Sequence, residues 1–260
     1  MIFETHAHYD DSRFDADRRE LLSSRLPAAG VDKVMNVASD FASLKTTNEL
    51  TGEYRNVYGA LGLHPSEIRD MSEDTVDVIK RLVINNPKIR AIGEIGLDYH
   101  YEGYDVNEQS AAFIRQIDLA KELELPVIVH SRDAASDTMR IINERYTGKE
   151  ERINGVIHCF SYSAEEARKY IRLGFVIGVG GVVTYKNGRK LKETVKDIPL
   201  DRMVLETDCP YLSPEPFRGE RNSSVNLKYV IKAVAEIKDI SEEEVEKVTY
   251  DTALRLYGFI

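Results

Sequence analysis

Short runs of apolar and β-branched residues alternate with longer amphipathic stretches along the whole chain. Runs such as 31–37 and 175–179 are rich in valine, isoleucine and phenylalanine and are typical of buried strands. We therefore predict eight strands, at 1–10, 31–37, 57–63, 89–95, 126–130, 155–158, 175–179 and 203–206.

The stretches between these strands carry helix signals. Gly30 follows an apolar periodic stretch and is a typical helix stop. Ser163 and Ser241 each precede a glutamate three residues later, which is the capping-box pattern of a helix start, and Asp105 with Glu108 is similar. We predict helices over 14–29, 41–53, 133–146 and about 190–196, helices that begin at 72, 105 and 163, and two more at the C-terminus.

Strands that alternate with helices, without a long linker, predict a parallel sheet. At 260 residues a closed (β/α)8 barrel of the TIM type is the favoured form, as a single domain over 1–260. An open, doubly wound sheet is the alternative. No phosphate-binding glycine fingerprint follows the first strand, which disfavours that alternative.

Composition narrows the class of protein. Apolar residues make up 42% of the chain and charged residues 30%, as in ordinary globular proteins. The net charge of −9 argues against a broad basic surface for duplex DNA. It does not exclude a phosphate substrate whose charge is neutralised locally by metal ions. Two cysteines, no signal-peptide pattern and no apolar run of about 20 residues predict a reduced, cytoplasmic protein without a membrane partner. No obligate protein partner is evident.

The polar residues that draw attention all stand at or just after the ends of predicted strands. His6 and His8 are two residues apart on the first strand, so their side chains point the same way, roughly 7 Å apart. In a barrel the carboxyl ends of the strands converge on one mouth, where barrel enzymes keep their chemistry. The candidates at this mouth are His6, His8, His64, Glu94, His130, His158 and Asp208.

The types of side chain suggest the chemistry. Imidazoles with carboxylates suit Zn²⁺, Mn²⁺ or Fe²⁺, and carboxylates with water suit Mg²⁺. The four histidines, Glu94 and Asp208 are too many for one catalytic ion that keeps an open position. Two divalent ions that share a bridging carboxylate would use them all and would generate a hydroxide near neutral pH. We therefore predict two ions per chain (Mg, Mn or Zn) and metal-assisted hydrolysis.

These residues carry a family resemblance that runs along nearly the whole chain. The sequence resembles the TatD family of metal-dependent deoxyribonucleases, within the amidohydrolase-like barrels. The matching motifs are Thr5-His6-Ala7-His8, Gly62-Leu63-His64-Pro65, Gly93-Glu94-Ile95-Gly96-Leu97-Asp98-Tyr99, His130-Ser131-Arg132-Asp133-Ala134, His158-Cys159-Phe160-Ser161 and Glu206-Thr207-Asp208-Cys209-Pro210-Tyr211-Leu212.

The resemblance implies hydrolysis of phosphodiester bonds in DNA, with 3′-to-5′ exonuclease action on single strands in some members. It implies two ligand sets that share Glu94: His6, His8, Glu94 and Asp208 for one ion, and Glu94, His130 and His158 for the second. Single-stranded DNA, or another phosphodiester, is then the expected partner.

Several residues are expected to have roles beyond metal binding. Asp208 can take a proton from the attacking water, and Asp98 is expected to orient a ligand histidine. Tyr9, Tyr99 and Tyr211 flank the motifs and are candidates for stacking against bases, with packing as the alternative. The expected catalytic residues are Asp208, Glu94 and His64, and the expected substrate contacts are His64, Arg132, Arg218 and Asn222. The alternative for His64 is packing within its loop, and the alternative for Arg132 is a salt bridge such as one to Asp133.

The sequence departs from the family pattern in two places. The family's Arg-Gly-x-Arg-Asn stretch is present at 218–222, but Ser223-Ser224 follows where an acidic residue and proline are usual. Asp251 replaces the usual asparagine of the last helix. The first departure concerns the shape of the substrate rim and leaves the metal ligands intact.

Two other functions fit the same residues. One is a hydrolase on this barrel that acts on an amide, a lactone or a phosphotriester. Several barrels of that kind bridge their metals with a carboxylated lysine, and the residue here is Glu94, which favours the nuclease. The other is a metal-binding barrel that has lost catalysis, against which the intact ligand set argues.

Overall fold

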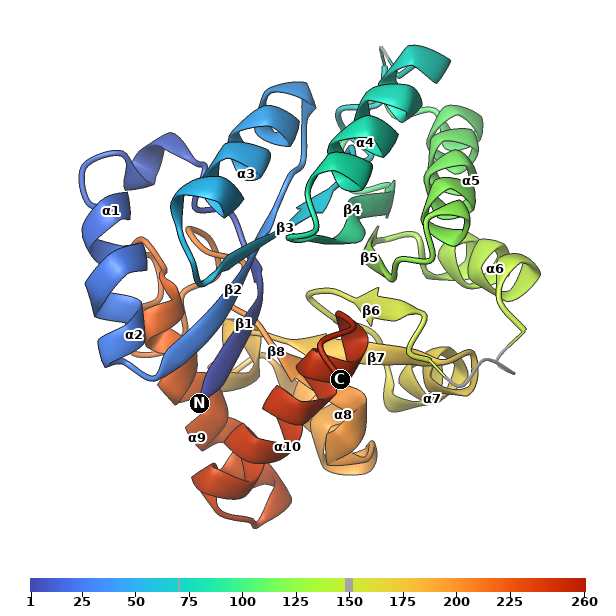
Figure 1. Cartoon of the computed structure of the whole chain (residues 1–260). Helices are drawn as coiled ribbons and strands as arrows, with labels where there is room; N and C mark the ends of the chain where they lie inside the picture. Colours follow the sequence, from blue (N-terminus) through green and yellow to red (C-terminus); the bar gives the residue numbers. More distant parts are fainter. Residues whose placement is uncertain (70, 148–151) are drawn as a thin grey trace.

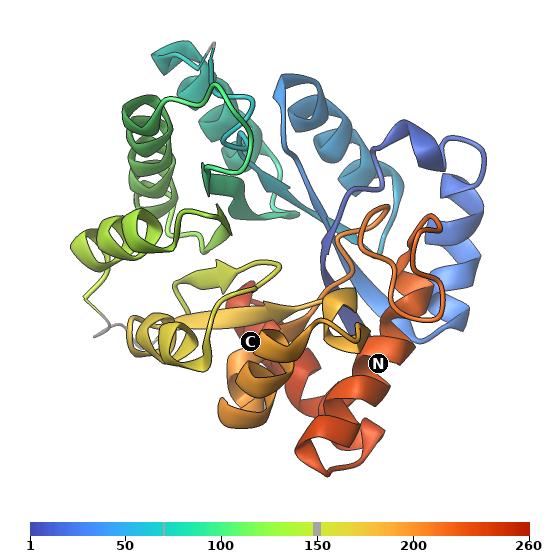
Figure 2. The ribbon, with the colours of Figure 1, turned by 180° about the vertical axis from the view of Figure 1, so that it is seen from behind.

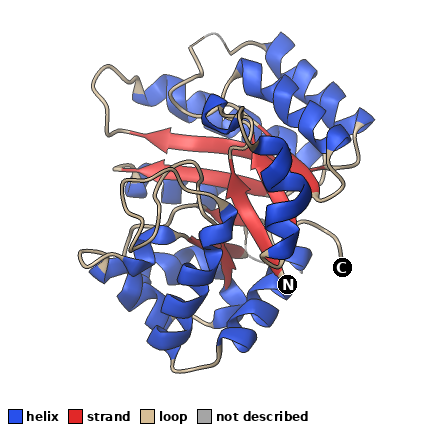
Figure 3. Cartoon of the chain, turned by 90° about the vertical axis from the view of Figure 1, so that its left-hand side faces the viewer, coloured by secondary structure: helices blue, strands red, loops and turns tan. Residues whose placement is uncertain are grey.

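The computed structural model describes residues 1–69, 71–147 and 152–260. Its strands form one parallel sheet in the order β1 to β8, with helices (blue) outside the strands (red) in Figure 3. The predicted barrel is confirmed. The strands are β1 (Ile2–Ala7), β2 (Val31–Val37), β3 (Val57–Leu61), β4 (Ile89–Asp98), β5 (Val127–Arg132), β6 (Gly155–Ile157), β7 (Phe175–Val179) and β8 (Met203–Leu205).

The ring closes between β1 and the chain at the end of β8. The Thr5 hydroxyl donates to the carbonyl of Leu205 over 2.9 Å. One step further, the N–H of Asp208 donates to the carbonyl of His6 over 3.0 Å. These bonds place the last motif of the sequence beside the first.

Helices follow the strands at most of the predicted positions. The expected first helix is instead a succession of turns, because a π-helical turn over Leu21–Arg25 separates two short α-helical turns and Pro27 lies in the second. Among the described residues, the helices are too short or too polar for a membrane span. The helices are α1 (Arg18–Glu20), α2 (Leu26–Ala28), α3 (Phe41–Glu53), α4 (Glu73–Asn85), α5 (Val106–Glu122), α6 (Ala135–Arg145), α7 (Ala164–Arg172), α8 (Arg189–Asp197), α9 (Leu227–Lys238) and α10 (Glu242–Leu256).

The last helix closes one end of the barrel. Tyr250 and Tyr257 pack against Phe3 and the other apolar side chains of the barrel interior. The buried hydroxyl of Tyr257 donates to the carbonyl of Thr5 over 3.0 Å. In Figure 1, α10 (red) crosses the end of the barrel where the chain begins. The opposite end, where the strands finish, is therefore the end at which a site can open.

Candidate metal centre

The candidate ligands gather at the open end of the barrel, around a hollow of about 710 Å³. Loops that follow the strands surround it, and the long loop after β8 (orange in Figure 2) lies beside the start of the chain (blue). His6 is fully buried beneath the hollow. The candidate ligands that line the hollow itself are His8, Glu94, His130, His158 and Asp208.

The first ligand group consists of His6, His8 and Asp208. The Nε2 atoms of the two histidines are 3.2 Å apart, so the alternation of the strand does bring both rings to one point. Asp208 Oδ1 lies 3.3 Å from Nε2 of His8 and 3.7 Å from Nε2 of His6. Asp208 has a φ of +58°, in the left-handed region that aspartate tolerates better than most residues.

The second ligand group consists of His130 and His158. Nδ1 of His130 lies 2.8 Å from Glu94 Oε1, and Nε2 of His158 lies 3.1 Å from the same oxygen. The other oxygen, Oε2, is turned toward the first group, at 3.6 Å from Nε2 of His6 and 4.0 Å from Nε2 of His8. Glu94 therefore presents one oxygen to each ligand group.

These spacings fit the ligands of a metal ion. Two atoms that each lie about 2.1 Å from one ion are themselves roughly 3 to 3.5 Å apart. The 3.2 Å between the two Nε2 atoms is of this size. Unprotonated Nε2 atoms would point lone pairs at each other, and a cation among them removes that repulsion. The donor set of imidazole nitrogens and carboxylate oxygens therefore fits a divalent ion.

Three of the ligand histidines have an oxygen near the ring nitrogen that does not face the other ligands, a position from which an oxygen can orient the ring. Nδ1 of His8 lies 2.8 Å from the carbonyl oxygen of Val37. Asp98 Oδ2 lies 3.2 Å from Nε2 of His130, as expected from the sequence. Glu206 Oε1 lies 3.4 Å from Nδ1 of His158, an ion-pair distance, and within the described part of the chain this nitrogen makes no hydrogen bond.

The electrostatics of the cluster favour positive charge at its centre. Burial by itself would raise the pKa of Glu94, but His158 and His6 beside it hold that pKa well below its usual range. Burial opposes a charged His8, yet the neighbouring carboxylate of Asp208 raises the pKa of His8 to about 9. The carboxylates thus stay ionised and draw in a cation, which a bound metal would supply in place of a proton.

Two buried glutamates organise the cluster and were not singled out from the sequence. Glu206 accepts from the N–H of Cys159, and its Oε2 has no hydrogen-bond partner among the residues that the structure describes. Glu4 accepts from the N–H groups of His6 and Thr207, at 3.1 and 2.9 Å, so it ties β1 to the chain before Asp208. Burial raises the pKa of Glu4 to about 7, against the hydrogen bonds that it accepts. A carboxylate inside or just after a buried apolar run is the signal that could have found both.

The structure divides the expected substrate contacts into two pairs. His64 and Arg132 line the hollow, and the His64 ring lies 4.4 Å from that of His130. Arg218 lies instead over the ring of Tyr185, at 4.5 Å. Asn222 is fully buried and donates to the carbonyls of Thr207 and Tyr211. The last two residues support the loop after β8 and lie outside the lining of the hollow.

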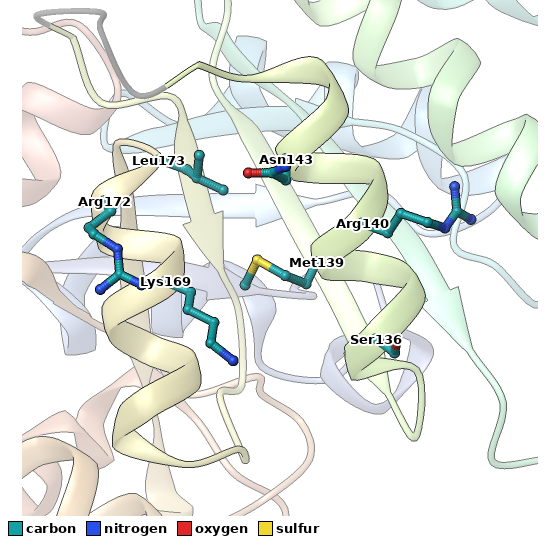
Figure 4. A pocket seen from close by; sticks show the side chains of 7 residues that line it. All are labelled: Ser136, Met139, Arg140, Asn143, Lys169, Arg172 and Leu173. Atoms are coloured by element: carbon teal, nitrogen blue, oxygen red, sulfur yellow. The ribbon is translucent and has the colours of Figure 1, made fainter.

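A second hollow, of about 380 Å³, lies between α6 and α7. Figure 4 shows side chains from both helices around it. None of the described residues that line it is a histidine, cysteine or carboxylate, so this part of its lining lacks the donors of the open end. The lining residues are Ser136, Met139, Arg140, Asn143, Lys169, Arg172 and Leu173.

Comparison with known proteins agrees with this geometry. The chain is 42% identical to the metal-dependent hydrolase YabD of Bacillus subtilis, over 99% of both chains. It is 34% identical to the metal-dependent hydrolase YcfH of Escherichia coli, over 99% of this chain and 96% of YcfH. The crystal structure of the TatD homologue YjjV from E. coli superimposes with a TM-score of 0.92 at 29% identity, over 99% of this chain and 98% of that one. These names specify metal-dependent hydrolysis and leave the substrate open.

A family model described as TatD related DNase matches residues 3–258. That range contains every residue of the two ligand groups and Glu94 between them. The chain belongs to the TatD family of metal-dependent hydrolases.

Proposed function

We propose that this protein hydrolyses phosphodiester bonds with two divalent ions, and that its substrate is the 3′ end of single-stranded DNA. One observation carries the binuclear part: the two oxygens of Glu94 face two different groups of ligands. The DNA part is supported by the description of the family as related to DNases. A hollow of about 710 Å³ at the end of the barrel is also expected to admit a strand end more readily than a duplex.

Divalent ions at such a site supply a hydroxide nucleophile near neutral pH and neutralise charge on the reacting oxygens. The chain contributes the proton acceptor. Burial would raise the pKa of Asp208, but the hydrogen bond from His8 and the nearby histidines lower it. Asp208 is therefore an ionised carboxylate beside His8, and it can take the proton of the attacking water.

His64 contributes a hydrogen-bond donor. The backbone N–H of Ser66 points at Nδ1 of His64 over 3.2 Å, and because an N–H can only donate, Nδ1 accepts. Burial lowers the pKa of His64 to about 4, so the ring is neutral at pH 7 and carries its one proton on Nε2. We propose that this Nε2–H donates a hydrogen bond to a non-bridging oxygen of the phosphate.

The test compares substrates on protein reconstituted separately with Mg²⁺, Mn²⁺ and Zn²⁺. The substrates are labelled single-stranded DNA, duplex DNA, closed circular DNA and a panel of small esters, amides and phosphotriesters. We expect a ladder that shortens from the 3′ end of the single strand, and little action on intact duplex. Rapid cuts in a closed circle would contradict the exonuclease, and turnover confined to an amide or a phosphotriester would contradict the nuclease.

A further inference from the structure

Two exposed tyrosines stand on opposite walls of the hollow. Tyr101 follows β4 and is 64% exposed, and Tyr211 follows β8 and is 48% exposed. In a ring of eight strands in sequence order, β4 and β8 lie across from each other. Tyr9, the flanking tyrosine of the first motif, is fully buried, and Tyr99 is stacked on Tyr104.

Each exposed ring has an arginine beside it. Cζ of Arg13 lies 4.2 Å from the centre of the Tyr211 ring, and Asp11 holds this guanidinium through Nε and Nη2 at 2.9 and 2.7 Å. Across the hollow, Cζ of Arg132 lies 5.3 Å from the centre of the Tyr101 ring. Each guanidinium lies over one face of its ring, so a base would stack on the other face of the tyrosine, against a ring already paired with a planar cation.

The charge of the rim disfavours recognition of the DNA backbone. Besides the ligands and Asp98, four carboxylates line the hollow: Asp10, Asp11, Asp40 and Glu67. Among the described lining residues, Arg132 is the one lysine or arginine. Arg13 pairs with Asp11, which leaves Asp10, Asp40 and Glu67 as excess negative charge. Phosphates beyond the one at the metal ligands would therefore meet like charge, whereas a base presents no charge and has an aromatic face to stack.

We infer that Tyr101 and Tyr211 are stacking platforms for the bases on the two sides of the reacting phosphate, so that this site recognises a single strand by its bases. This inference rests on the proposed function and adds that the substrate must carry bases next to the reacting phosphate. His8 supports the position of one platform, because its ring lies 6.3 Å from that of Tyr211.

The experiment compares a single-stranded oligonucleotide with the same strand carrying abasic residues at its 3′-terminal positions. In Tyr101→Leu and Tyr211→Leu we expect KM for the normal strand to rise at least about tenfold, as for loss of a stacked base. KM for the abasic strand should change little. Tyr101→Phe and Tyr211→Phe keep the ring and should retain binding. Tyr104→Leu is the matched control, an exposed tyrosine of the same loop outside the hollow.

Methyl 4-nitrophenyl phosphate, which carries no base, separates the two proposals. If the metal-loaded wild type fails to hydrolyse every phosphodiester, the proposed function is wrong and the inference falls with it. If it hydrolyses them but the leucine variants handle normal and abasic strands alike, the inference alone is overturned. Metal content and circular dichroism of each variant confirm that the ligands and the fold are intact.

Salt dependence gives a second reading. For single strands the slope of log affinity against log salt is about −0.7 per phosphate contacted. Recognition through bases predicts a slope no steeper than about −1.5, equivalent to roughly two phosphates. A slope steeper than about −3 would show that the backbone is read along its length and would overturn the inference.

Discussion

At the scale of single residues, Glu94 is the side chain on which both ligand groups depend. Its replacement by glutamine keeps the shape but removes the charge that offsets two close cations. Repulsion between doubly charged ions roughly 4 Å apart is severe, so Glu94→Gln should empty at least one site. His158→Ala should weaken mainly the second group. Elemental analysis is expected to find about two ions in the wild type, about one in His158→Ala and one or fewer in Glu94→Gln.

Circular dichroism must show that both variants are folded before their metal content is compared. A folded Glu94→Gln protein that retains two tightly bound ions would show that Glu94 is not the bridge.

Asp208 should matter for turnover more than for folding. Its carboxylate lines the hollow and lies 3.3 Å from Nε2 of His8, so Asp208→Asn keeps the volume and loses the proton acceptor. We expect turnover to fall at least about a hundredfold, the lower range for loss of general acid–base help. The measurement is kcat at saturating metal, with a thermal melt to check the fold. Turnover near that of the wild type would remove Asp208 from the mechanism.

The sequence identifies a residue of the metal centre when a side chain that can bind metal stands at the end of a predicted strand. Histidines and carboxylates at strand ends meet at the hollow because the ends of parallel strands converge. Glu206 and Glu4 are harder to identify from the sequence. Glu206 lies near a ring nitrogen of His158, and Glu4 accepts from backbone N–H groups, and only the closed barrel brings these groups together. Tyr101 lies in a loop, where no periodicity fixes the direction of a side chain.

At the scale of the elements, β7 packs against Glu206, the glutamate that lies beside His158 of the second ligand group. A Cβ on Gly178 would lie 2.4 Å from Oε2 of Glu206, whereas a Cβ on Gly180 would be 3.4 Å from its nearest neighbour. Gly178→Ala should therefore displace Glu206 from His158. We expect roughly tenfold weaker metal binding, as for loss of an orienting partner, and a loss of about 1 to 3 kcal/mol in the free energy of unfolding.

Gly180→Ala is the matched control, since the same methyl group is added two residues further along with room for it. Metal titration followed by calorimetry gives both quantities for each variant. Equal metal affinity in the two variants would mean that Glu206 does not position His158.

Strands and helices differ in how far the sequence alone predicts them. Runs such as Phe175–Val179 are buried on both faces, so their ends coincide with the ends of the apolar run. The stretch before β2 has helical spacing, but Pro27 lacks an N–H and cannot continue the hydrogen bonds of a regular helix. Its apolar residues were predicted to be helical, and its division into separate turns was not.

At the scale of the whole molecule, the two ends of the barrel have separate tasks. Apolar side chains and α10 fill the end where the strands begin, and polar ligands occupy the end where they finish. This division lets a cluster of carboxylates and imidazoles lie above an apolar core whose packing provides the stability. The cytoplasmic location stays a prediction, based on composition.

This division also predicts how metal removal affects folding. Ligands from β1 to the end of β8 meet only in the closed barrel, so an ion binds the folded chain far better than the unfolded one. An ion present at a hundred times its Kd adds about 2.7 kcal/mol to the free energy of unfolding. For a chain of this size that corresponds to roughly 5 to 10 °C in Tm.

Scanning calorimetry with and without a chelator measures this difference. We expect the metal-loaded wild type to melt higher than the stripped protein, and Glu94→Gln to show a smaller difference, because one carboxylate no longer holds an ion. The stripped wild type should regain its Tm when Mg²⁺ or Mn²⁺ is returned, since the barrel core does not depend on the ion. An identical Tm in metal and in chelator would mean that the cluster binds no ion tightly in the folded chain.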